Sequence, residues 1–520
     1  MAKSTPDILA IHARRTPERA ALIEDPPNGP TTVWSFAELD RQTNRLANTL
    51  SALGVQPGQK VIWCGMNSPG VVWMMHAARK IGAVAVPLNY RLSPEEAAYI
   101  VDDSDAVLVY ADADYVDLFA GIRAEIPKVK HVLIFGGAPG PDMLAVDALL
   151  DRASDAGPRT DPSGAAVNTM IYTSGTTGHP KGAVRAALGD PELLRQLVAR
   201  IGYVPEDVYL TTGPLYHSGP GGFMMIAQTL GNTVVVQRKF DAVDWLRLVE
   251  QHRVTTTFSA PTPIRMVCDL PAETKARFDR SSMRRMIGNA APWSFALKKA
   301  YLADFPEDSL WEVYGSTELG VNNVLAPEDQ LRKPGSCGQA APGVELRLID
   351  EKGQEISEPN VPGELFVRSK AAFSSYYKAH EKFEKSRRGD FLTVGDIAYF
   401  DDEGYYYICD RKNDMIISGG MNIYPAEIES ALDHHPDVAD VAVIGIPSEP
   451  WGESVHAVVV RRGNGLTEDA LLAFAREHLA GYKIPRSISW SDEIPRNASG
   501  KILKKVLREP FWKDRERQVG

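Results

Sequence analysis

The stretch KVIWCGMNSPGVVWMMHAARKIGAVAVPLNYRLSPEEAAYIVDDSDAVLVYAD, residues 60–112, decides the fold class because strand and helix patterns alternate along it. Its short apolar runs predict buried strands. Between them, Pro69 begins one helix that ends before Gly82, and Ser93 and Pro94 begin a second. Strands that alternate with helices form a parallel sheet covered on both faces, so we expect a doubly wound α/β fold.

Helical signals also precede residue 60, whereas a different pattern appears later in the chain. Ser35 and Glu38 form a capping box at the start of a helix that stops at Gly54. Residues 342–369 combine short alternating strands with Gly and Pro turns, which indicates a small β-barrel-like antiparallel unit. A polar cluster at 410–414 follows, and we place a domain boundary there. We therefore predict a large N-terminal domain, residues 1–410, and a small α+β C-terminal domain, residues 411–520.

The composition narrows the function classes. The 520 residues are 44% hydrophobic and 24% charged, with a formal net charge of −10. No apolar run approaches the length of about 18 residues that a membrane span needs, and the first residues lack a signal segment, so we expect a cytoplasmic protein without an integral membrane segment. The negative charge argues against nucleic acid as a partner. The cysteines lack metal-binding spacing, so we expect reduced core residues: Cys64, Cys268, Cys337 and Cys409.

The loop MIYTSGTTGHPKGAVR, residues 170–185, is rich in glycine and hydroxyl side chains and contains Lys181. Glycines let backbone N–H groups approach an anion, and hydroxyls and a lysine add donors, so the loop suits phosphate. It is not the loop of kinases and GTPases, because His179 and Pro180 precede the lysine and Gly182, which cannot ligate a metal, follows it. Taken alone, the loop fits a surface turn as well.

Two further turns and one carboxylate suit a magnesium nucleotide. In WEVYGSTELG, residues 311–320, Glu318 suits Mg²⁺ and Thr317 a phosphate oxygen, because both provide hard oxygen ligands. The small-residue turn IGNAAP, residues 287–292, allows a flat ring to lie against the backbone. Asp396 follows a glycine, where a carboxylate can accept two ribose hydroxyls. Taken singly, each of these features is more often structural.

Two other stretches carry a histidine and a lysine on Gly-rich segments. LYHSGPGG, residues 215–222, places His217 before a glycine-rich opening, and PRNASGKI, residues 495–502, places Lys501 on a loop. The basic run that continues from this loop is more consistent with a solvated helix face than with a phosphate site. Its cations are Arg496, Lys504, Lys505 and Arg508.

Together and in this order, the stretches resemble the adenylate-forming acyl-CoA synthetases, whose relatives include nonribosomal adenylation domains and luciferases. YTSGTTGHPKG resembles the phosphate loop, YGSTE the adenine and magnesium turn, and Gly395 with Asp396 the ribose site. DRKNDMIISGGMNIYPAEIE resembles the hinge and thioester segment, and PRNASGKI the catalytic lysine loop. The resemblance covers nearly the whole chain. It implies an enzyme that uses ATP, Mg²⁺ and coenzyme A (CoA): a carboxylate attacks the α-phosphorus of ATP, and CoA thiolate then displaces AMP from the acyl-adenylate.

The resemblance also implies residue roles. The catalytic residues are Lys501, Thr317, Glu318 and His217, with Glu318 as the metal ligand. ATP and AMP are bound by Thr173, Ser174, Gly175, Thr176, Thr177, Gly178, Lys181, Gly288, Asn289, Ala290, Tyr314, Gly315, Ser316, Thr317, Asp396 and Arg411. The CoA channel is formed by Ser418, Gly419 and Gly420, and the acyl pocket by Tyr216, His217, Gly221, Phe258, Ala260 and Val321.

Two positions depart from the pattern of the family. Asn413 stands at the implied hinge of the mobile C-terminal domain, where relatives usually carry Asp or Lys; Asn tolerates unusual backbone angles and can serve. After the phosphate loop, Arg185 and Ala186 stand where many relatives have Thr-His. No implied ligand is lost, so we expect adenylation to survive and the acyl pocket to differ.

The implied pocket lining suggests the kind of acid. It carries no fixed charge, and the glycine-rich run 219–222 keeps volume free. We therefore favour a medium- or long-chain fatty acid, or a bulky alicyclic or aromatic acid, over acetate. An amino-acid-adenylating module would need a carboxylate in this pocket, and none is evident. An enzyme that passes the acyl group to another acceptor, an inactive nucleotide-binding homologue and a homodimer are left open.

Overall fold

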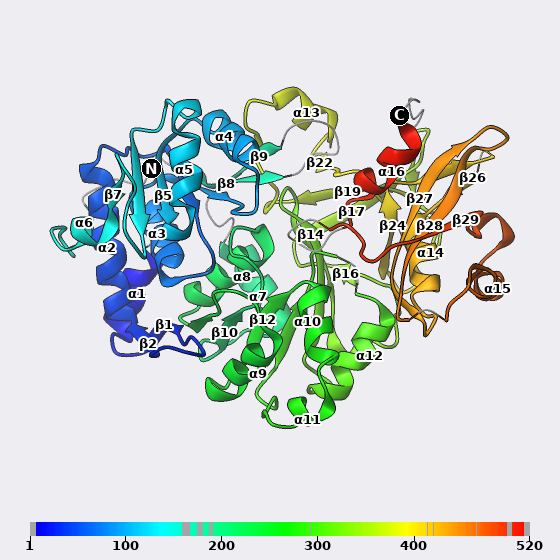
Figure 1. Ribbon diagram of the computed structural model, residues 1–520, viewed down its shortest axis with the longest axis horizontal. Helices are drawn as coiled ribbons and strands as arrows, with labels where there is room; N and C mark the ends of the chain where they lie inside the picture. Colours follow the sequence, from blue (N-terminus) through cyan, green and yellow to red (C-terminus); the bar gives the residue numbers. More distant parts are fainter. Residues whose placement is uncertain are drawn as a thin grey trace.

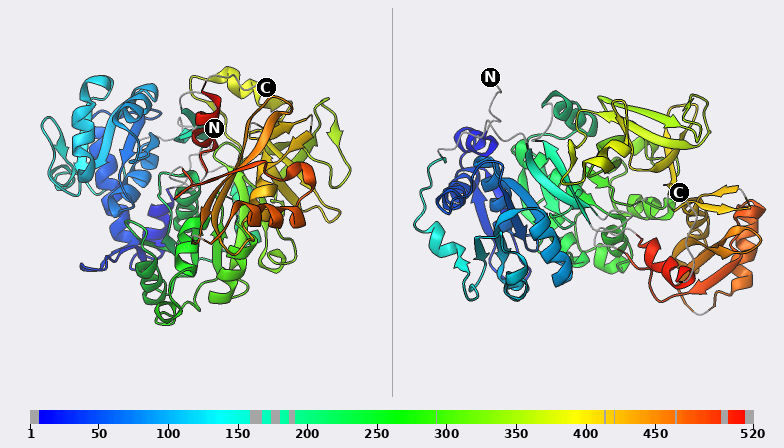
Figure 2. Two further views of the ribbon diagram at one scale, coloured as in Figure 1. Left: turned by 45° about the vertical axis from the view of Figure 1, so that its right-hand side comes forward. Right: turned by 90° about the horizontal axis from the view of Figure 1, so that it is seen from above.

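The computed structural model describes residues 7–158, 167–173, 180–186, 191–291, 293–412, 414–419, 421–463, 465–496 and 502–513. These residues form four β-sheets with helices around them (Figure 1). The second and fourth sheets lie at opposite ends of the molecule, and the views of Figure 2 agree on this arrangement. The packing of these sheets brings motifs from distant parts of the sequence close together.

The first sheet is a mainly parallel sheet with antiparallel edge strands. Its order is β16 (Gln339–Ala340), β15 (Gly320–Leu325), β14 (Leu310–Ser316), β13 (Arg285–Gly288), β12 (Thr256–Ser259), β10 (Val208–Thr211), β11 (Thr233–Val236), β1 (Ala20–Glu24) and β2 (Thr32–Ser35). Helices connect and flank these strands: α1 (Ile8–Arg15), α7 (Pro191–Ile201), α8 (Ser218–Thr229), α9 (Ala242–Gln251), α10 (Pro261–Cys268), α11 (Ala272–Lys275) and α12 (Phe295–Asp304).

The second sheet contains the stretch 60–112 and confirms the predicted doubly wound pattern. Its order is β20 (Ser375–Tyr376), β9 (Lys181–Ala186), β8 (Val167–Thr173), β4 (Val84–Leu88), β3 (Lys60–Cys64), β5 (Ala106–Asp112), β6 (His131–Phe135) and β7 (Leu144–Ala145). Its helices are α2 (Phe36–Ala52), α3 (Pro69–Lys80), α4 (Pro94–Asp103), α5 (Val116–Gly121) and α6 (Val146–Leu150). The capping box of Ser35 and Glu38 is formed at α2, and a second one caps α4.

The third sheet is antiparallel, as the turn-rich segment predicts. It contains β17 (Val344–Ile349), β18 (Glu355–Ile356), β19 (Gly363–Ser369), β21 (Arg387–Arg388), β22 (Phe391–Leu392), β23 (Asp396–Phe400) and β24 (Tyr406–Arg411), with α13 (His380–Lys385) beside it. Strands β23 and β24 form an antiparallel hairpin. One end of this hairpin carries Asp396 and Arg411, and the turn at residues 401–405 forms the other end.

The fourth sheet belongs to the C-terminal part of the chain and has a core of its own. It contains β25 (Ile416–Ser418), β26 (Met421–Ile423), β27 (Val438–Ser448), β28 (Gly452–Arg461) and β29 (Ser487–Trp490). Its helices are α14 (Pro425–Leu432), α15 (Glu468–His478) and α16 (Lys504–Trp512). The boundary near residue 411 stays a prediction.

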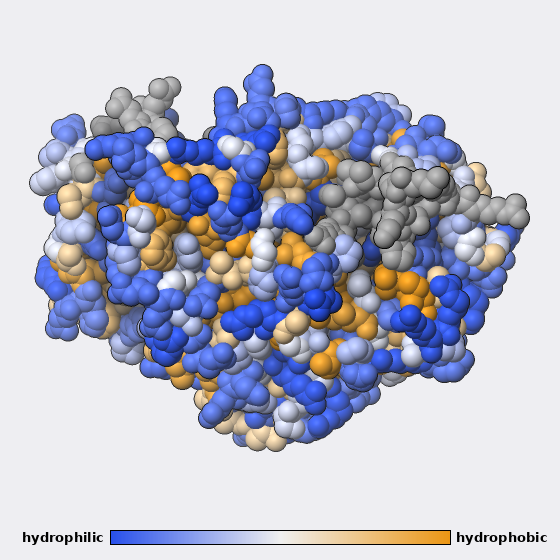
Figure 3. Space-filling view, turned by 180° about the vertical axis from the view of Figure 1, so that it is seen from behind, coloured by the Kyte–Doolittle hydropathy of each residue, from blue (hydrophilic) through white to orange (hydrophobic). Residues whose placement is uncertain are grey.

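The largest apolar core lies between the first two sheets, where α2, α3 and α8 contribute buried side chains. The outer surface is mainly hydrophilic, with patches of hydrophobic residues on the face shown in Figure 3. Across the described ranges, no helix has the length and apolar character to span a bilayer. All four cysteines are free thiols; Cys64 is buried as expected, whereas the other three are only half-buried.

Candidate active site

A cavity of about 330 Å³ lies where the first two sheets meet. Helices α3, α7 and α8 and strands β4, β8, β14 and β15 contribute to its walls. Five of the residues predicted for the acyl pocket line it: Tyr216, His217, Gly221, Phe258 and Val321. Ala260, the N-cap residue of α10, is not among the lining residues, so its assignment to the acyl pocket stays a prediction.

The residues from which we expected an uncharged pocket carry no charge, but other residues of the cavity wall do. Arg79, Arg185 and Lys370 also line the cavity. Arg79 lies on α3 and Lys370 follows β19, segments that no motif marks, so only the packing of distant elements reveals these cations.

The Glu318 carboxylate lies at the meeting point of three segments. Thr173, the last residue of β8, donates a hydrogen bond to Glu318 Oε1 over 3.0 Å, and the Tyr376 hydroxyl donates to the same oxygen over 3.1 Å. The Glu318 residue is 9% exposed. No described residue donates a hydrogen bond to its second oxygen, which leaves that atom for a cation. Tyr376 was missed by sequence reasoning, since the segment SSYY carries no distinguishing pattern.

Such a carboxylate fits Mg²⁺ brought in with a nucleotide. Mg²⁺ is usually held by one or two carboxylates together with substrate phosphates, rather than by a cage of protein ligands. The part of the chain that the structure describes contains no cluster of three or more His, Cys, Asp or Glu side chains that could hold a metal. A single carboxylate fixed by two hydroxyls matches the first arrangement.

Thr317 is held from two sides. Its hydroxyl contacts the Ser218 hydroxyl over 2.8 Å, and its carbonyl oxygen accepts a hydrogen bond from Arg185 over 2.9 Å. Arg185 also donates to the carbonyl oxygen of Ala371 over 3.0 Å. Burial lowers the pKa of the Arg185 guanidinium, and the nearby charge of Glu318 opposes this effect. Arg185, noted above as a departure from the family, thus positions the nucleotide turn and also lines the cavity.

Asp396 and Arg411 face each other at one end of the β23–β24 hairpin. They pair in the strand register, and Arg411 Nε lies 3.4 Å from Asp396 Oδ1. The Tyr314 hydroxyl, from the end of β14, donates a hydrogen bond to Asp396 Oδ2. Asp396 is buried. Three of the residues predicted for the nucleotide therefore meet in space although they are far apart in sequence.

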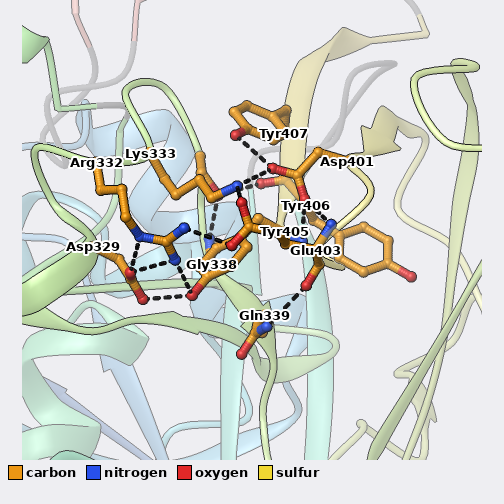
Figure 4. A network of polar contacts seen from close by, with 11 residues as sticks. Asp329, Arg332, Lys333, Gly338, Gln339, Asp401, Glu403, Tyr405, Tyr406 and Tyr407 are labelled. Atoms are coloured by element: carbon orange, nitrogen blue, oxygen red, sulfur yellow. Dashed lines mark hydrogen bonds and ion pairs between the residues drawn. The ribbon is translucent and has the colours of Figure 1, made fainter.

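A polar network anchors the other end of this hairpin (Figure 4). Lys333 lies 2.8 Å from Asp401, and it also pairs with Glu403. Arg332 pairs with Asp329 over 2.7 Å, and Tyr405 donates to Asp329 over 2.6 Å. These contacts tie the hairpin turn to the loop that follows β15. They fix the orientation of the hairpin, and with it the position of Asp396.

The predicted adenine turn is tightly constrained. Ala290 has φ of 72°, in the left-handed region that costs a non-glycine residue about 1–3 kcal/mol and is seen most often at functional sites. Asn289 donates to the carbonyl oxygen of Val313. At Gly315, a Cβ atom would lie 2.0 Å from the carbonyl oxygen of Gly320, so only glycine fits there. Gly288 is also packed closely, since a Cβ atom on this residue would lie 2.8 Å from the indole of Trp293.

Lys181 begins β9 and faces a basic surface pocket. Lys382 and Lys385 of α13 line the same pocket, together with Lys378, His380 and one acidic residue, Glu381. Burial and the neighbouring charge of Lys382 lower the pKa of Lys181 to about 8. The pocket is therefore suited to an anion, whose charge would offset the repulsion between the lysines.

The basic run near the C-terminus differs from its prediction as a solvated face. Lys504 is buried, and its Nζ lies 2.9 Å from Glu429 and 3.6 Å from Asp410. Arg508 pairs with Asp414 over 2.6 Å. These cations neutralise carboxylates on either side of position 413, because α16 packs back against the start of the C-terminal part. Lys505, by contrast, is exposed, as expected.

The implied CoA segment is described in part. Ser418 is buried at the end of β25. Gly419 has φ of 58°, and its N–H donates to the carbonyl oxygen of Trp451 over 2.8 Å. Several predicted residues lie outside the described residues: Ser174, Gly175, Thr176, Thr177, Gly178, Asn413, Gly420 and Lys501.

Comparison with known proteins identifies the family of the chain. Residues 9–377 match the AMP-binding enzyme family, and residues 427–501 match the AMP-binding enzyme C-terminal domain. A long-chain-fatty-acid–CoA ligase of Mycobacterium tuberculosis is 34% identical over 97% of this chain and 98% of its own length.

Two solved structures are also similar. One is an anthranilate CoA ligase in complex with anthranoyl-AMP, with a TM-score of 0.88, 26% identity and coverage of 98% of this chain and 97% of that chain. The other is an O-succinylbenzoate coenzyme A synthetase from Bacillus subtilis with ATP and magnesium ion, with a TM-score of 0.82, 30% identity and coverage of 97% and 99%.

The chain belongs to the AMP-binding enzyme family. It is an acid–thiol ligase of the AMP-forming acyl-CoA synthetase class, which uses ATP, Mg²⁺ and CoA and proceeds through an acyl-adenylate.

Proposed function

We propose that this ligase activates a carboxylic acid with a bulky apolar body: an alicyclic or aromatic acid, or a medium- or long-chain fatty acid. The cavity volume of about 330 Å³ supports this range. In this measure one water-sized group needs about 10–15 Å³, so the cavity has room for an acyl body much larger than that of acetate.

One observation carries the assignment of the reacting centre. Ser316 lines the cavity, while its neighbours Thr317 and Glu318 contact Ser218 and Thr173. An acid in the cavity would thus present its carboxylate beside the turn that we assign to the nucleotide phosphates. This adjacency is what attack on the α-phosphorus requires, because proximity of the reacting groups removes much of the entropic barrier.

In the first half-reaction, a carboxylate oxygen bonds to the α-phosphorus of ATP and pyrophosphate leaves. Both reactants are anions, so the site must offset their repulsion. We assign Thr173, Thr317 and Lys181 to the phosphates, Glu318 to the metal, and Asp396 to the ribose. Bound with ATP, Mg²⁺ supplies positive charge that stabilises the transferring phosphoryl group. The apolar walls exclude water, which would otherwise hydrolyse the mixed anhydride.

In the second half-reaction, the thiolate of CoA attacks the acyl carbon and AMP leaves. We assign Ser418, Gly419 and Gly420 to the channel for CoA and residue 413 to the hinge that presents this segment. Lys501, which belongs to the same C-terminal domain, serves the first half-reaction. We further propose that the enzyme acts in the cytoplasm, where ATP and CoA are available.

A screen of pyrophosphate release tests the proposal. Wild-type enzyme is incubated with ATP, Mg²⁺ and either acetate or one of a panel of cyclohexyl, aryl, medium-chain and long-chain carboxylic acids, with and without CoA. We expect release with one or more of these acids at a higher kcat/KM than with acetate, and thioester only when CoA is present. Highest kcat/KM with acetate would contradict the size assignment, and release without thioester would contradict CoA as the acceptor.

A further inference from the structure

Arg79 places a cationic group in the wall of the acyl cavity. It lies in the last turn of α3, one helical turn after Met75, and both residues line the cavity. Residues four apart lie on the same face of a helix, so α3 presents Met75 and Arg79 to the cavity together. Apolar residues of the cavity wall include Trp63, Ala85 and Leu197, and Thr169, opposite Ala85, also lines it.

The strand directions place Arg79 at the end of the cavity farthest from the nucleotide turn. Helix α3 runs antiparallel to the strands it connects, so its last turn lies near the amino end of β4, which begins at Val84. Strand β8 runs parallel to β4, with Ala85 opposite Thr169. Thr173, which contacts Glu318, is four residues further along β8, about 13 Å at about 3.3 Å per residue.

The Arg79 guanidinium has no partner among the residues that the structure describes. Its neighbour Lys80 pairs with Asp7 over 2.6 Å and with Asp40 over 2.7 Å, but no described group accepts a hydrogen bond from Arg79 or forms an ion pair with it. Burial lowers the pKa of Arg79, with the more distant Asp7 acting in the opposite direction. Arg79 is half-buried. A cation held in such a wall without a partner is costly, and an acceptor on a ligand would offset that cost.

The two other cations of the cavity do not share this property. Arg185 donates to the carbonyl oxygens of Thr317 and Ala371, so it is held by the protein itself. Lys370 is also engaged in an interaction. Among the described residues, Arg79 is therefore the cation of this wall whose donors remain for a substrate.

We propose that Arg79 binds a second carboxylate at the far end of the acyl substrate, so that the preferred acid is a dicarboxylic acid with an apolar body between its two carboxylates. This inference rests on the proposed function and specifies its substrate class. A guanidinium presents paired N–H donors that match both oxygens of a carboxylate. A site built around such a pair also rejects analogues that lack the group, because they leave the cation unpaired.

Matched acids of one chain length test this assignment. The kcat/KM for pyrophosphate release is measured with octanoate, 7-oxooctanoate and octanedioate, for wild type, Arg79→Met, Arg79→Lys and Arg41→Met. Arg41 is an exposed arginine of α2, so its replacement removes the same charge away from the cavity. For wild type and Arg41→Met, we expect octanedioate to exceed octanoate about 10- to 100-fold, as for a hydrogen bond between charged groups.

For Arg79→Met, we expect the KM for octanedioate to rise, so that the preference for octanedioate over octanoate is lost or inverted. Octanoate should still be adenylated. Arg79→Lys should keep part of the preference, because the charge remains but the paired donors do not. Activity with octanoate shows that a variant is folded. Should a variant not fold, the wild-type ranking decides alone: equal or better use of octanoate or 7-oxooctanoate overturns the inference but leaves the proposed function intact. Absence of release with every acid, including those of the wider panel, overturns both.

Discussion

At the scale of single residues, the site depends on how a few polar side chains are held. Glu318 accepts hydrogen bonds from Thr173 and Tyr376 on one oxygen, and no other described residue donates to its carboxylate. This arrangement orients the carboxylate and leaves its second oxygen for a cation. Two hydroxyl donors on one oxygen also tolerate an amide oxygen in the same place. Charge and geometry at this position can therefore be separated by mutation.

Glu318→Gln should raise the Mg²⁺ concentration needed for half-maximal adenylation about 10- to 100-fold. The amide keeps an acceptor for the two hydroxyls but removes the charge. The measurement is the initial rate of pyrophosphate release against Mg²⁺ concentration. Glu328→Gln is the matched control, because Glu328 lies in the loop after β15, outside the site. An unchanged Mg²⁺ midpoint with a lower maximal rate would instead assign Glu318 to the orientation of Thr173 and Tyr376.

Lys181 should make ATP capture sensitive to pH. Its pKa of about 8 is lowered by burial and by Lys382, so the cationic form is present below pH 8 and is lost as the pH rises through this value. We expect kcat/KM for ATP, which reports groups of the free enzyme, to fall with a midpoint near pH 8. Lys382→Met should move the midpoint toward the ordinary lysine value of 10.5.

Lys385→Met serves as the control for this profile. Lys385 lines the same pocket, but it is not among the groups that shift the pKa of Lys181. Its replacement should lower kcat/KM at every pH without moving the midpoint. A midpoint that stays near pH 8 in Lys382→Met would show that another group titrates.

At the scale of elements, α16 holds the start of the C-terminal part. Lys504 is buried against Glu429 of α14 and Asp410 of β24, and burial raises the pKa of both carboxyls. Burial alone would lower the pKa of Lys504, but the two carboxylates raise it. Arg508 adds its pair with Asp414 on the other side of residue 413. One helix therefore braces both flanks of the predicted hinge.

Lys504→Met should destabilise the C-terminal part by about 3–5 kcal/mol, because it leaves two buried carboxylates without their cation. The loss should shrink as the pH falls: the raised pKa values mean that the folded state takes up protons before the unfolded state does, so acid favours the folded variant. Urea denaturation monitored at several pH values measures this effect. Lys505→Met, which changes an exposed lysine of the same helix, should have little effect. Equal stability of the two variants would contradict the bracing role.

At the scale of the whole molecule, the C-terminal domain after residue 413 carries residues assigned to both half-reactions, Lys501 to the first and residues 418–420 to the second. Among the described residues, Arg265 donates to the carbonyl oxygen of Ala439 over 3.3 Å, and Asn422 donates to Glu351 over 3.3 Å. These long polar contacts between the two parts are compatible with relative motion of domains, whereas Asp410, next to the predicted hinge, is held by Lys504 and by the Ala426 N–H. Movement of the C-terminal domain about residue 413 between the two half-reactions can therefore be tested.

Lys501→Ala should slow acyl-adenylate formation about 10²- to 10³-fold, as for removal of one charge-stabilising donor, and leave thioester formation intact. The second step is measured by supplying synthetic acyl-adenylate together with CoA. Gly420→Leu, which would fill the proposed CoA channel, should show the opposite: one turnover of pyrophosphate release and little thioester.

Circular dichroism controls for folding in both variants. A folded Lys501→Ala enzyme that is equally slow in both half-reactions would contradict the assignment of Lys501 to the first half-reaction and of residues 418–420 to the second. A Gly420→Leu enzyme with normal thioester formation would remove residues 418–420 from the channel.

The sequence by itself determined the local elements and the nucleotide motifs. Ser35, Ser93 and Pro69 specify where their helices begin, because caps and a proline at the first turn act through neighbouring backbone groups. The order of the motifs likewise indicated the family and its reaction. Each of these signals lies within a few consecutive residues, so a single sequence is enough to detect it.

Only the tertiary structure decided which distant side chains share the site. Tyr376 reaches Glu318, Ser218 reaches Thr317, and Arg79 enters the acyl cavity, although no local pattern marks any of them. The same holds for Lys504, whose buried carboxylate partners are remote in sequence, so that its charge pattern suggested a solvated face. Burial and ionic pairing depend on the packing of whole sheets and helices, and this packing is set by contacts that sequence spacing does not encode.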